Sequence, residues 1–272
     1  MSVKLVTNEK VAETSSKGNQ EKWFDKAANK WYKLDQFGYE ALAEVTVSRL
    51  LQLSNITSET SFCFVKYNME KLNVHSRERT GCSSESFLKE GQSIITLSHL
   101  LKRYNRFLKE KLEGLSSDKK RIAYLADTTK ELTGLESFPQ YLTLLFEIDS
   151  LVLNDDRHLN NIALIEQNGK YDYCPIFDNG AGLLSNIQFS PMNIEPKGLI
   201  KGLVARPFNT SFTRQMNTAR EMYGKILKMP ILTRKDIYEI LYPLLEYYPE
   251  RDRAIIADRA CQCILTRQKF LF

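Results

Sequence analysis

The hydrophobic pattern of the amino-terminal part of the chain favours a strand hairpin followed by one helix. Residues 22–35 hold two short aromatic-rich runs around a polar turn at 26–30, which predicts two strands joined by that turn. From Gly38 to Leu53, apolar side chains recur at spacings that place them on one helix face. Polar residues follow, so we expect a β-hairpin and then a helix that ends near Ser54.

The pattern then returns to strands and changes once more near Gly91. Residues 60–70 and 79–87 have the composition of strands and are separated by a polar loop that contains residues 75–78. Beyond Gly91, most apolar residues recur at helical spacing. The predicted helical runs are 97–113, 138–153 and three further runs toward the C-terminus.

These elements predict an α+β fold of bilobal shape. A small β-rich lobe with one helix is expected at about residues 1–90, and a larger helical lobe at about 91–272. A chain of 272 residues can bury a substantial core, and no repeat or evident linker interrupts it. We therefore expect a single domain that covers residues 1–272.

Composition excludes several classes of protein. With 43% hydrophobic and 26% charged residues, the chain resembles ordinary globular proteins. It has no apolar run of membrane-spanning length, and its N-terminus lacks the apolar segment of a secretory signal, so we expect a cytoplasmic protein without a membrane partner. Secretion by a route that needs no signal peptide stays open. The net charge of +5 is modest and basic residues look scattered, which predicts no direct nucleic-acid binding. The five cysteines lack CxxC spacing, which favours reduced thiols over a zinc site.

A hairpin interrupts the helical part and carries the candidate chemistry. Two β-rich runs flank Asn168-Gly169, a dipeptide that favours a tight turn because both residues tolerate positive φ. Antiparallel pairing about this turn brings Asn161 near Asp178. Asp156 lies in the loop just before Asn161. We expect these three side chains to meet at the mouth of the helical lobe.

Their chemistry suits phosphoryl transfer. Such transfer needs a positioned hydroxyl and cations that neutralise the β- and γ-phosphates. Asp178 and Asn161 supply the hard oxygen ligands that Mg²⁺ prefers. Asp156 could orient an acceptor hydroxyl and take its proton, with Asp155 as the only nearby rival. The neighbouring Arg157 and His158 are expected to brace the loop.

The same residues carry a resemblance to a known family. The pattern Asp-Arg-His-x-x-Asn at 156–161, followed by Asp-Asn-Gly at 178–180, resembles the catalytic loop and metal-binding aspartate of the protein-kinase-like superfamily. HipA-like kinases and phosphoinositide lipid kinases share this form, whereas eukaryotic protein kinases have the order His-Arg-Asp. The resemblance implies a protein-kinase-like fold that uses ATP and Mg²⁺.

The amino-terminal segment favours the HipA-like branch. Residues 15–22 resemble the Ser-x-x-Gly-x-Gln-x-Lys phosphate loop of that family. A glycine lets the backbone approach phosphate closely, and successive N–H groups bind anions. The resemblance implies that the loop's nucleotide-binding residues are Ser16, Gly18, Gln20 and Lys22. It also makes Ser15 the candidate for autophosphorylation.

Two further residues complete the predicted nucleotide site. Lys33, at the end of a predicted strand, matches the family's lysine for the α- and β-phosphates. Glu44, on the following helix, matches the glutamate that pairs with this lysine, and Glu40 is the alternative one turn earlier. The runs KLDxFGYExLAE, GCxSxxFLKEG and ARPF make the short, single-domain CtkA-type group the nearest branch, over about residues 12–250.

The leading hypothesis is a HipA-like serine/threonine protein kinase that transfers the ATP γ-phosphate to a protein hydroxyl. Autophosphorylation, a toxin-like role and an antitoxin partner follow from the resemblance as expectations. The extra amino-terminal domain of full-length HipA toxins is not expected here, which leaves the toxin role and the mode of antitoxin binding open. Two alternatives stay: a small-molecule or lipid kinase of the same superfamily, and a nucleotide-binding partner protein without turnover.

Overall fold

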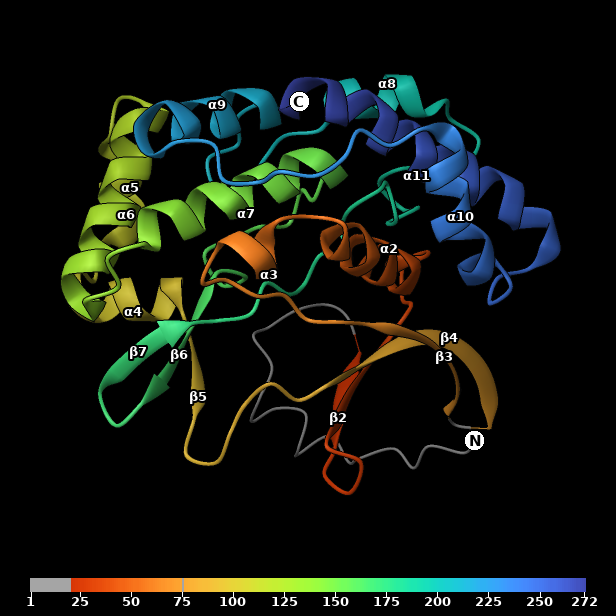
Figure 1. Ribbon diagram of the computed structural model, residues 1–272, viewed down its shortest axis with the longest axis horizontal. Coiled ribbons are helices and arrows are strands. Elements are labelled where there is room, and N and C mark those ends of the chain that lie inside the picture. The colour runs from red at the N-terminus through yellow and green to blue at the C-terminus, as the bar shows by residue number, and fades with distance from the viewer. Residues whose placement is uncertain (1–20, 75) are drawn as a thin grey trace.

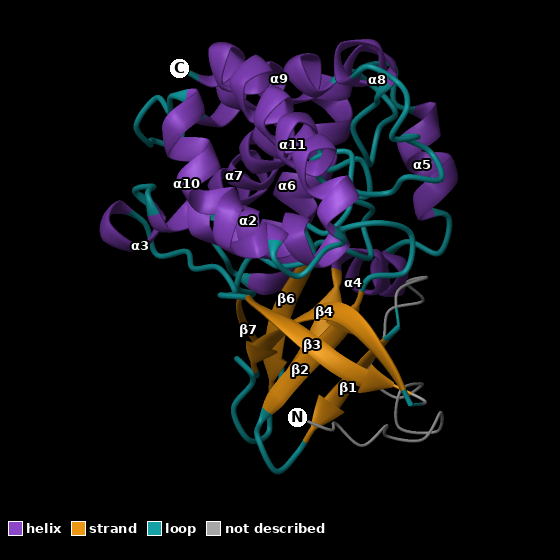
Figure 2. Ribbon diagram, turned by 90° about the vertical axis from the view of Figure 1, so that its right-hand side faces the viewer, coloured by secondary structure: helices purple, strands orange, loops and turns teal. Residues whose placement is uncertain are grey.

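The computed structural model describes residues 21–74 and 76–272. Residues 15–20 of the predicted phosphate loop lie outside the described residues, as does His75. Within the described part, the strands gather at one end of the molecule and most helices at the other, as Figures 1 and 2 show.

A four-stranded antiparallel sheet forms most of the strand-rich end, in the order β1-β2-β4-β3. Its strands are β1 (Lys22–Asp25), β2 (Lys30–Leu34), β3 (Asn68–Val74) and β4 (Arg77–Glu85). The predicted first hairpin is confirmed. Its aromatic residues face each other across the two strands: Trp23 pairs with Tyr32 and Phe24 with Trp31, with ring centroids 5.5 and 5.0 Å apart. Such cross-strand pairs stabilise a hairpin by up to about 1 kcal/mol each.

The boundaries predicted for the second hairpin were partly wrong. The strand expected at 60–70 begins only at Asn68 and continues to Val74, and Arg77 and Glu78, which were expected in the loop, begin β4. The apolar run before Asn68 crosses from the helices to the sheet. Phe64 forms an isolated parallel bridge with Ile176, far along the chain, so the β propensity of this run serves a contact with another segment.

Helix α2 (Glu40–Gln52) lies between the sheet and the other helices (Figure 2) and confirms the predicted helix. It packs against three strands of the first sheet and against α10 (Arg234–Leu245). Nearly all of its residues are buried, including Glu40 and Glu44. A short helix, α3 (Ile56–Glu59), follows it.

A second antiparallel sheet has the order β5-β6-β7 and lies beside the helical part (Figure 1). It consists of β5 (Ser93–Thr96), β6 (Ala163–Gln167) and β7 (Lys170–Tyr173). The turn predicted at Asn168-Gly169 is confirmed, because both residues have positive φ, 52° and 73°. Strand β5 was not predicted from the sequence.

The helical part is built around α7 (Phe138–Val152), which is buried along nearly its whole length. It packs against α6, α9 and α11. The remaining helices are α4 (Leu97–Tyr104), α5 (Leu108–Gly114), α6 (Asp118–Thr133), α8 (Pro196–Gly202), α9 (Phe212–Tyr223) and α11 (Glu250–Leu271). Among the described residues, no helix is both long and apolar enough to cross a membrane.

The helix predicted over 97–113 is divided in two. Its backbone becomes extended at Asn105, with φ −132° and ψ 104°. The Asn105 side chain accepts a hydrogen bond from the Phe107 N–H at 3.0 Å, a local bond that competes with the helical one. The break separates α4 from α5. The α+β fold class is as predicted.

We expect Leu144→Ala to destabilise the protein by about 2–5 kcal/mol, because Leu144 of α7 is fully buried and its loss leaves a cavity. Chemical denaturation would measure the change in the free energy of unfolding. The matched control is Leu53→Ala, since Leu53 is 46% exposed. Equal losses in the two variants would contradict the central place of α7 in the core.

Candidate active site

Lys33 forms the centre of a buried ion-pair cluster. Its Nζ lies 2.5 Å from Oε1 of Glu44 on α2 and 2.8 Å from Oδ1 of Asp178, which follows β7. The side chains of Lys33 and Glu44 are 11% and 0% exposed, and that of Asp178 is 24% exposed. The structure therefore brings three of the predicted site residues together from three separate segments.

Glu44, and not Glu40, contacts the lysine. The second carboxylate oxygen of Glu44 accepts a hydrogen bond from the Asn179 N–H at 2.9 Å. Glu40 lies one turn earlier and accepts hydrogen bonds from the Phe37 and Gly38 N–H groups at 2.7 and 3.1 Å. It therefore fixes the start of α2, while Glu44 joins the β2 lysine to the segment that carries Asp178.

Electrostatics keep Lys33 and Asp178 ionised. Burial raises the pKa of Asp178, but the positive charges of Lys33 and Lys22 outweigh this effect and bring the pKa down to about 2. Burial lowers the pKa of Lys33, yet Asp178 and Glu44 hold it well above its ordinary value. Lys22 is the direct partner of Lys33 across β1 and β2, and burial lowers its pKa although Asp178 opposes this. Two cations thus lie close to Asp178.

Arg157 holds the loop and the hairpin in place. Its fully buried guanidinium contacts the Asp149 carboxylate at 3.0–3.1 Å through Nε and Nη2. Nη1 donates to the Asn161 and Phe177 carbonyl oxygens at 3.0 and 2.9 Å. Nη2 also donates to Oδ1 of Asn179 at 2.7 Å. As expected, Arg157 braces the site.

The meeting of the loop with the hairpin depends on this arginine more than on strand pairing. The register about Asn168-Gly169 is as predicted, but the ladder ends at the pair Leu164–Tyr173. Beyond that point, the shared hydrogen bonds of Arg157 hold the Asn161 and Phe177 backbones together. Asp178 then follows with φ at 62°, a left-handed conformation that is uncommon for a non-glycine residue and is found where the surroundings fix the backbone.

Asp156 lies at the exposed end of the loop. One of its carboxylate oxygens is 2.9 Å from Nε2 of His158, and the other accepts a hydrogen bond from Nδ2 of Asn161 at 3.2 Å. Burial raises the pKa of Asp156, His158 lowers it and Asp178 raises it. The rival Asp155 is half-buried, and burial together with the charge of Asp156 raises its pKa to about 6.

The expected metal ligands have suitable free oxygens. Asn161 uses its Nδ2 for both side-chain hydrogen bonds, so within the described part of the chain its Oδ1 is unengaged. Asp178 offers Oδ2, since Lys33 occupies Oδ1. One amide and one carboxylate oxygen, completed by phosphate oxygens and water, fit Mg²⁺. No group of three or more His, Cys, Asp or Glu residues that could hold a metal occurs among the described residues, so a fully protein-made metal cage is not found there.

The sequence reasoning missed Asp149 and Asn179. Asp149 lies within α7, most of whose residues are apolar, and is 1% exposed. An acidic residue in such a mostly apolar helix signals a buried partner, because an unpaired buried charge is costly. Asn154 Nδ2 also donates to Asp149, at 2.9 Å. Asn179 was matched only as part of the Asp-Asn-Gly motif and was given no role, whereas its backbone and side chain join Glu44 to Arg157.

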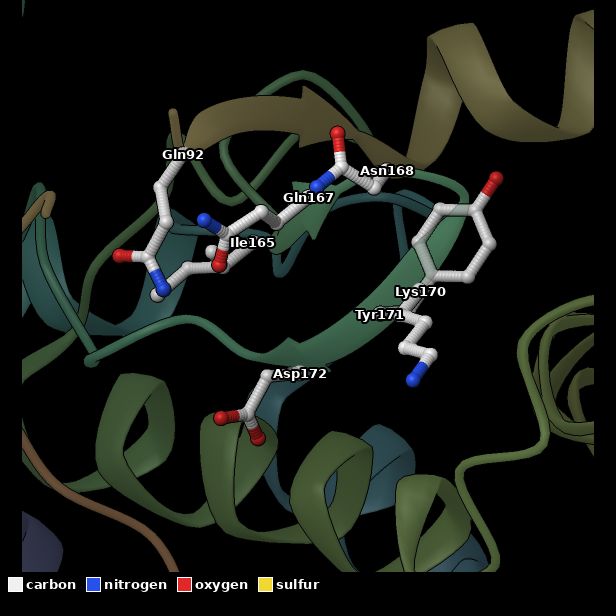
Figure 3. Close-up of a pocket in the computed structure, with 7 residues that line it drawn as sticks. All are labelled: Gln92, Ile165, Gln167, Asn168, Lys170, Tyr171 and Asp172. Carbon is white, nitrogen blue, oxygen red and sulfur yellow. The ribbon is translucent and has the colours of Figure 1, made fainter. Parts of the chain in front are cut away.

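A separate depression of about 450 Å³ lies at the β6–β7 hairpin (Figure 3). Gln92, from the segment just before β5, lies beside Ile165 and Gln167 of β6, and residues of β7 such as Asp172 complete the lining. None of the predicted site residues lines this depression. It is therefore not the candidate active site.

Comparison with known proteins identifies the fold. No family model matches the sequence, and no curated protein matches it. The structure does match the crystal structure of a Helicobacter pylori proinflammatory kinase, CtkA, with a TM-score of 0.59 and 10% identity, over 94% of this chain and 92% of that one. The chain has a kinase-like fold. The expected resemblance to CtkA-type kinases is thereby confirmed at the level of the fold.

A second match is HipA of the Shewanella oneidensis MR-1 toxin–antitoxin system, solved with HipB and operator DNA. Its TM-score is 0.49 and its identity 14%, over 93% of this chain. The chain spans 64% of the HipA chain.

Breaking the buried Arg157–Asp149 pair is expected to cost about 3–5 kcal/mol, because removal of one partner leaves the other charge buried and unpaired. We therefore expect Arg157→Met to lower the free energy of unfolding by this amount in chemical denaturation. Arg251→Met is the control, because the Arg251 side chain is 86% exposed. A loss below about 1 kcal/mol for Arg157→Met would show that this pair does not stabilise the fold.

Proposed function

We propose that this protein is an ATP-dependent phosphotransferase, and more specifically a HipA-like serine/threonine protein kinase. The observation that carries the proposal is the contact of Lys33 Nζ with both Glu44 and Asp178, beside a loop that presents Asp156 and Asn161. The kinase-like fold supports it. A phosphoryl-transfer site needs this set of groups: a cation for phosphate, oxygen ligands for metal and a carboxylate for the acceptor hydroxyl.

The proposed nucleotide-binding groups are Lys33 and Lys22, on paired positions of β1 and β2. Lys33 is held by the buried Glu44, so its ammonium group is positioned before nucleotide binds. It would contact the α- and β-phosphates, and Lys22 would add a second positive charge nearby. Ser15, Ser16, Gly18 and Gln20 lie outside the described residues, and their phosphate-loop and autophosphorylation roles stay predictions.

The proposed metal ligands are Asp178 and Asn161. Mg²⁺ bound there would neutralise negative charge on the β- and γ-phosphates. The residues of this chain set the position of those ligands: Arg157 holds both backbones through the Asn161 and Phe177 carbonyls, and Lys33 holds the Asp178 carboxylate. Asp178 is ionised at neutral pH because its pKa is about 2.

Asp156 is the proposed acceptor-side group. Its exposed carboxylate can accept a hydrogen bond from a serine or threonine hydroxyl, orient it toward the γ-phosphate and take its proton late in the transfer. Asn161 and His158 contact its two oxygens and so fix the carboxylate plane. A partner antitoxin, a toxin-like role and a cytoplasmic location accompany this proposal as predictions from the family resemblance.

Substitution of the two neighbouring aspartates separates their roles. We expect Asp156→Asn to abolish transfer of labelled γ-phosphate from ATP, to the protein itself or to an added protein such as casein, because the acceptor hydroxyl loses its base. Asp155→Asn should retain most of the transfer.

A thermal shift with ATP and Mg²⁺ should persist in Asp156→Asn and weaken in Asp178→Asn, since only the second change removes a metal ligand. Full transfer by both Asp156→Asn and Asp178→Asn would exclude the proposed mechanism. Label on added lipids or small molecules alone would favour the alternative kinase class.

The two glutamates of α2 provide a matched pair for the lysine contact. We expect Glu44→Gln to reduce the rate of transfer by about 100-fold, because misplacement of the phosphate-binding lysine costs alignment. Glu40→Gln changes the same charge one turn away and should reduce the rate far less, since Glu40 contacts only backbone N–H groups. Steady-state ATP turnover with the same acceptor measures both. A larger effect for Glu40→Gln would reverse the assignment.

A further inference from the structure

A surface that contains no residue of the Lys33 ion-pair cluster concentrates the positive charge of the chain. Residues 102–121 contain eight Lys or Arg residues against three Asp or Glu residues, a net charge of +5. The whole chain has the same net charge of +5, so acidic and basic residues balance in the rest of the sequence. The scattered distribution expected from composition therefore does not hold for this segment.

The fold gathers this segment into one surface, which we call the α4–α6 surface and define as residues 102–121. It comprises the end of α4, α5 and the start of α6, at the left edge of Figure 1. Tyr124 of α6 connects the pieces: its hydroxyl accepts a hydrogen bond from Asn105 at 3.5 Å, and its ring lies 5.7 Å from Lys111 Nζ. Arg121 Nε also donates to the Leu112 carbonyl at 3.1 Å.

Two exposed aromatic rings alternate with the basic residues of this surface. Tyr104 and Phe107 are 64% and 65% exposed. Arg103 precedes the first ring and Arg106 the second. Among the described residues, Lys102, Arg103 and Arg106 form no ion pair, so their charges are available to a ligand. The break between α4 and α5 exposes both rings: Tyr104 is the last residue of α4, and Phe107 directly precedes α5.

The arrangement distinguishes between classes of negatively charged partner. A membrane-binding helix needs an apolar face toward the lipid. In α4 the apolar residues Leu97, Leu100 and Leu101 are buried in the core, so that face is already used. An acidic peptide could bind the charges but would not require two exposed rings. Single-stranded nucleic acid uses both features, because phosphates bind Arg and Lys while bases stack on aromatic side chains.

We propose that the α4–α6 surface binds single-stranded nucleic acid. Tyr104 and Phe107 stack on bases, while Arg103, Arg106 and Lys102 contact phosphates. The proposal does not depend on the phosphotransferase activity, since none of these residues belongs to the candidate active site. Recognition of this kind tolerates many base sequences, because every base has a stacking face.

Fluorescence anisotropy with labelled oligouridylate and oligothymidylate of about 20 nucleotides tests the proposal. We expect binding at about 50 mM salt that weakens steeply toward 200 mM. Arg103→Glu/Arg106→Glu should weaken binding at least tenfold and lower the slope of log affinity against log salt by about 1.4, because two phosphate contacts on a single strand are lost. Tyr104→Ala/Phe107→Ala should weaken binding about tenfold with little change in this slope, because stacking is not electrostatic.

Matched controls change equivalent residues elsewhere. Lys197→Glu/Lys201→Glu makes the same charge change on exposed positions of α8, and Tyr242→Ala removes an exposed ring of α10. Both should leave the affinity within about twofold, and thermal denaturation should show all variants folded. The proposal is overturned by absence of binding at 50 mM salt, by equal losses in the controls, or by no loss in the aromatic variant. Binding only to polyglutamate or only to phosphatidylserine vesicles would also overturn it, in favour of an acidic protein or a membrane.

Discussion

The guanidinium of Arg157 is buried, and the equally buried carboxylate of Asp149 on α7 is its counter-ion. Removing two such charges from water costs several kcal/mol each, and the pair is tolerated only where further hydrogen bonds satisfy both groups. Here Arg157 donates to oxygens of Asn161, Phe177 and Asn179, and Asp149 accepts a further hydrogen bond from Asn154. The buried guanidinium of Arg157 requires hydrogen-bond acceptors, and these acceptors lie in the loop and in the segment that carry the proposed metal ligands. Its hydrogen bonds therefore fix the positions of both.

From Arg157 the contacts continue into the strand-rich end of the molecule. Asn179 accepts from Arg157 through its side chain and donates to Glu44 through its backbone N–H. Glu44 in turn holds Lys33, and Lys33 returns to Asp178. Helix α2 thus joins β2 to the helical part by packing and by a closed set of ionic contacts. Such preorganisation is what the proposed transfer requires, because positioning and electrostatic stabilisation supply most of its catalysis.

Local sequence signals predicted the elements whose conformation depends on near neighbours. The Asn168-Gly169 turn, the aromatic hairpin before α2 and α2 itself were all found, since each depends on φ preferences or short-range periodicity. The run at 60–70 was misassigned because its β-forming residues contact a distant segment through Phe64. Strand β5 was missed for the same reason: it is short and pairs with β6, about seventy residues later.

The sequence alone determined which kinds of groups the candidate site contains: Asp156, Asn161 and Asp178 in order, with a lysine and two candidate glutamates upstream. It could not decide between Glu40 and Glu44, because both lie on one face of the same helix, four residues apart. Only the tertiary structure decided this choice. It brings together Lys33 and Asp178, which are 145 residues apart in the sequence, and it places Glu44 rather than Glu40 in contact with Lys33. The partners of Arg157 were decided in the same way. A buried charge takes whichever groups the fold brings within hydrogen-bond distance, and sequence spacing does not encode that distance.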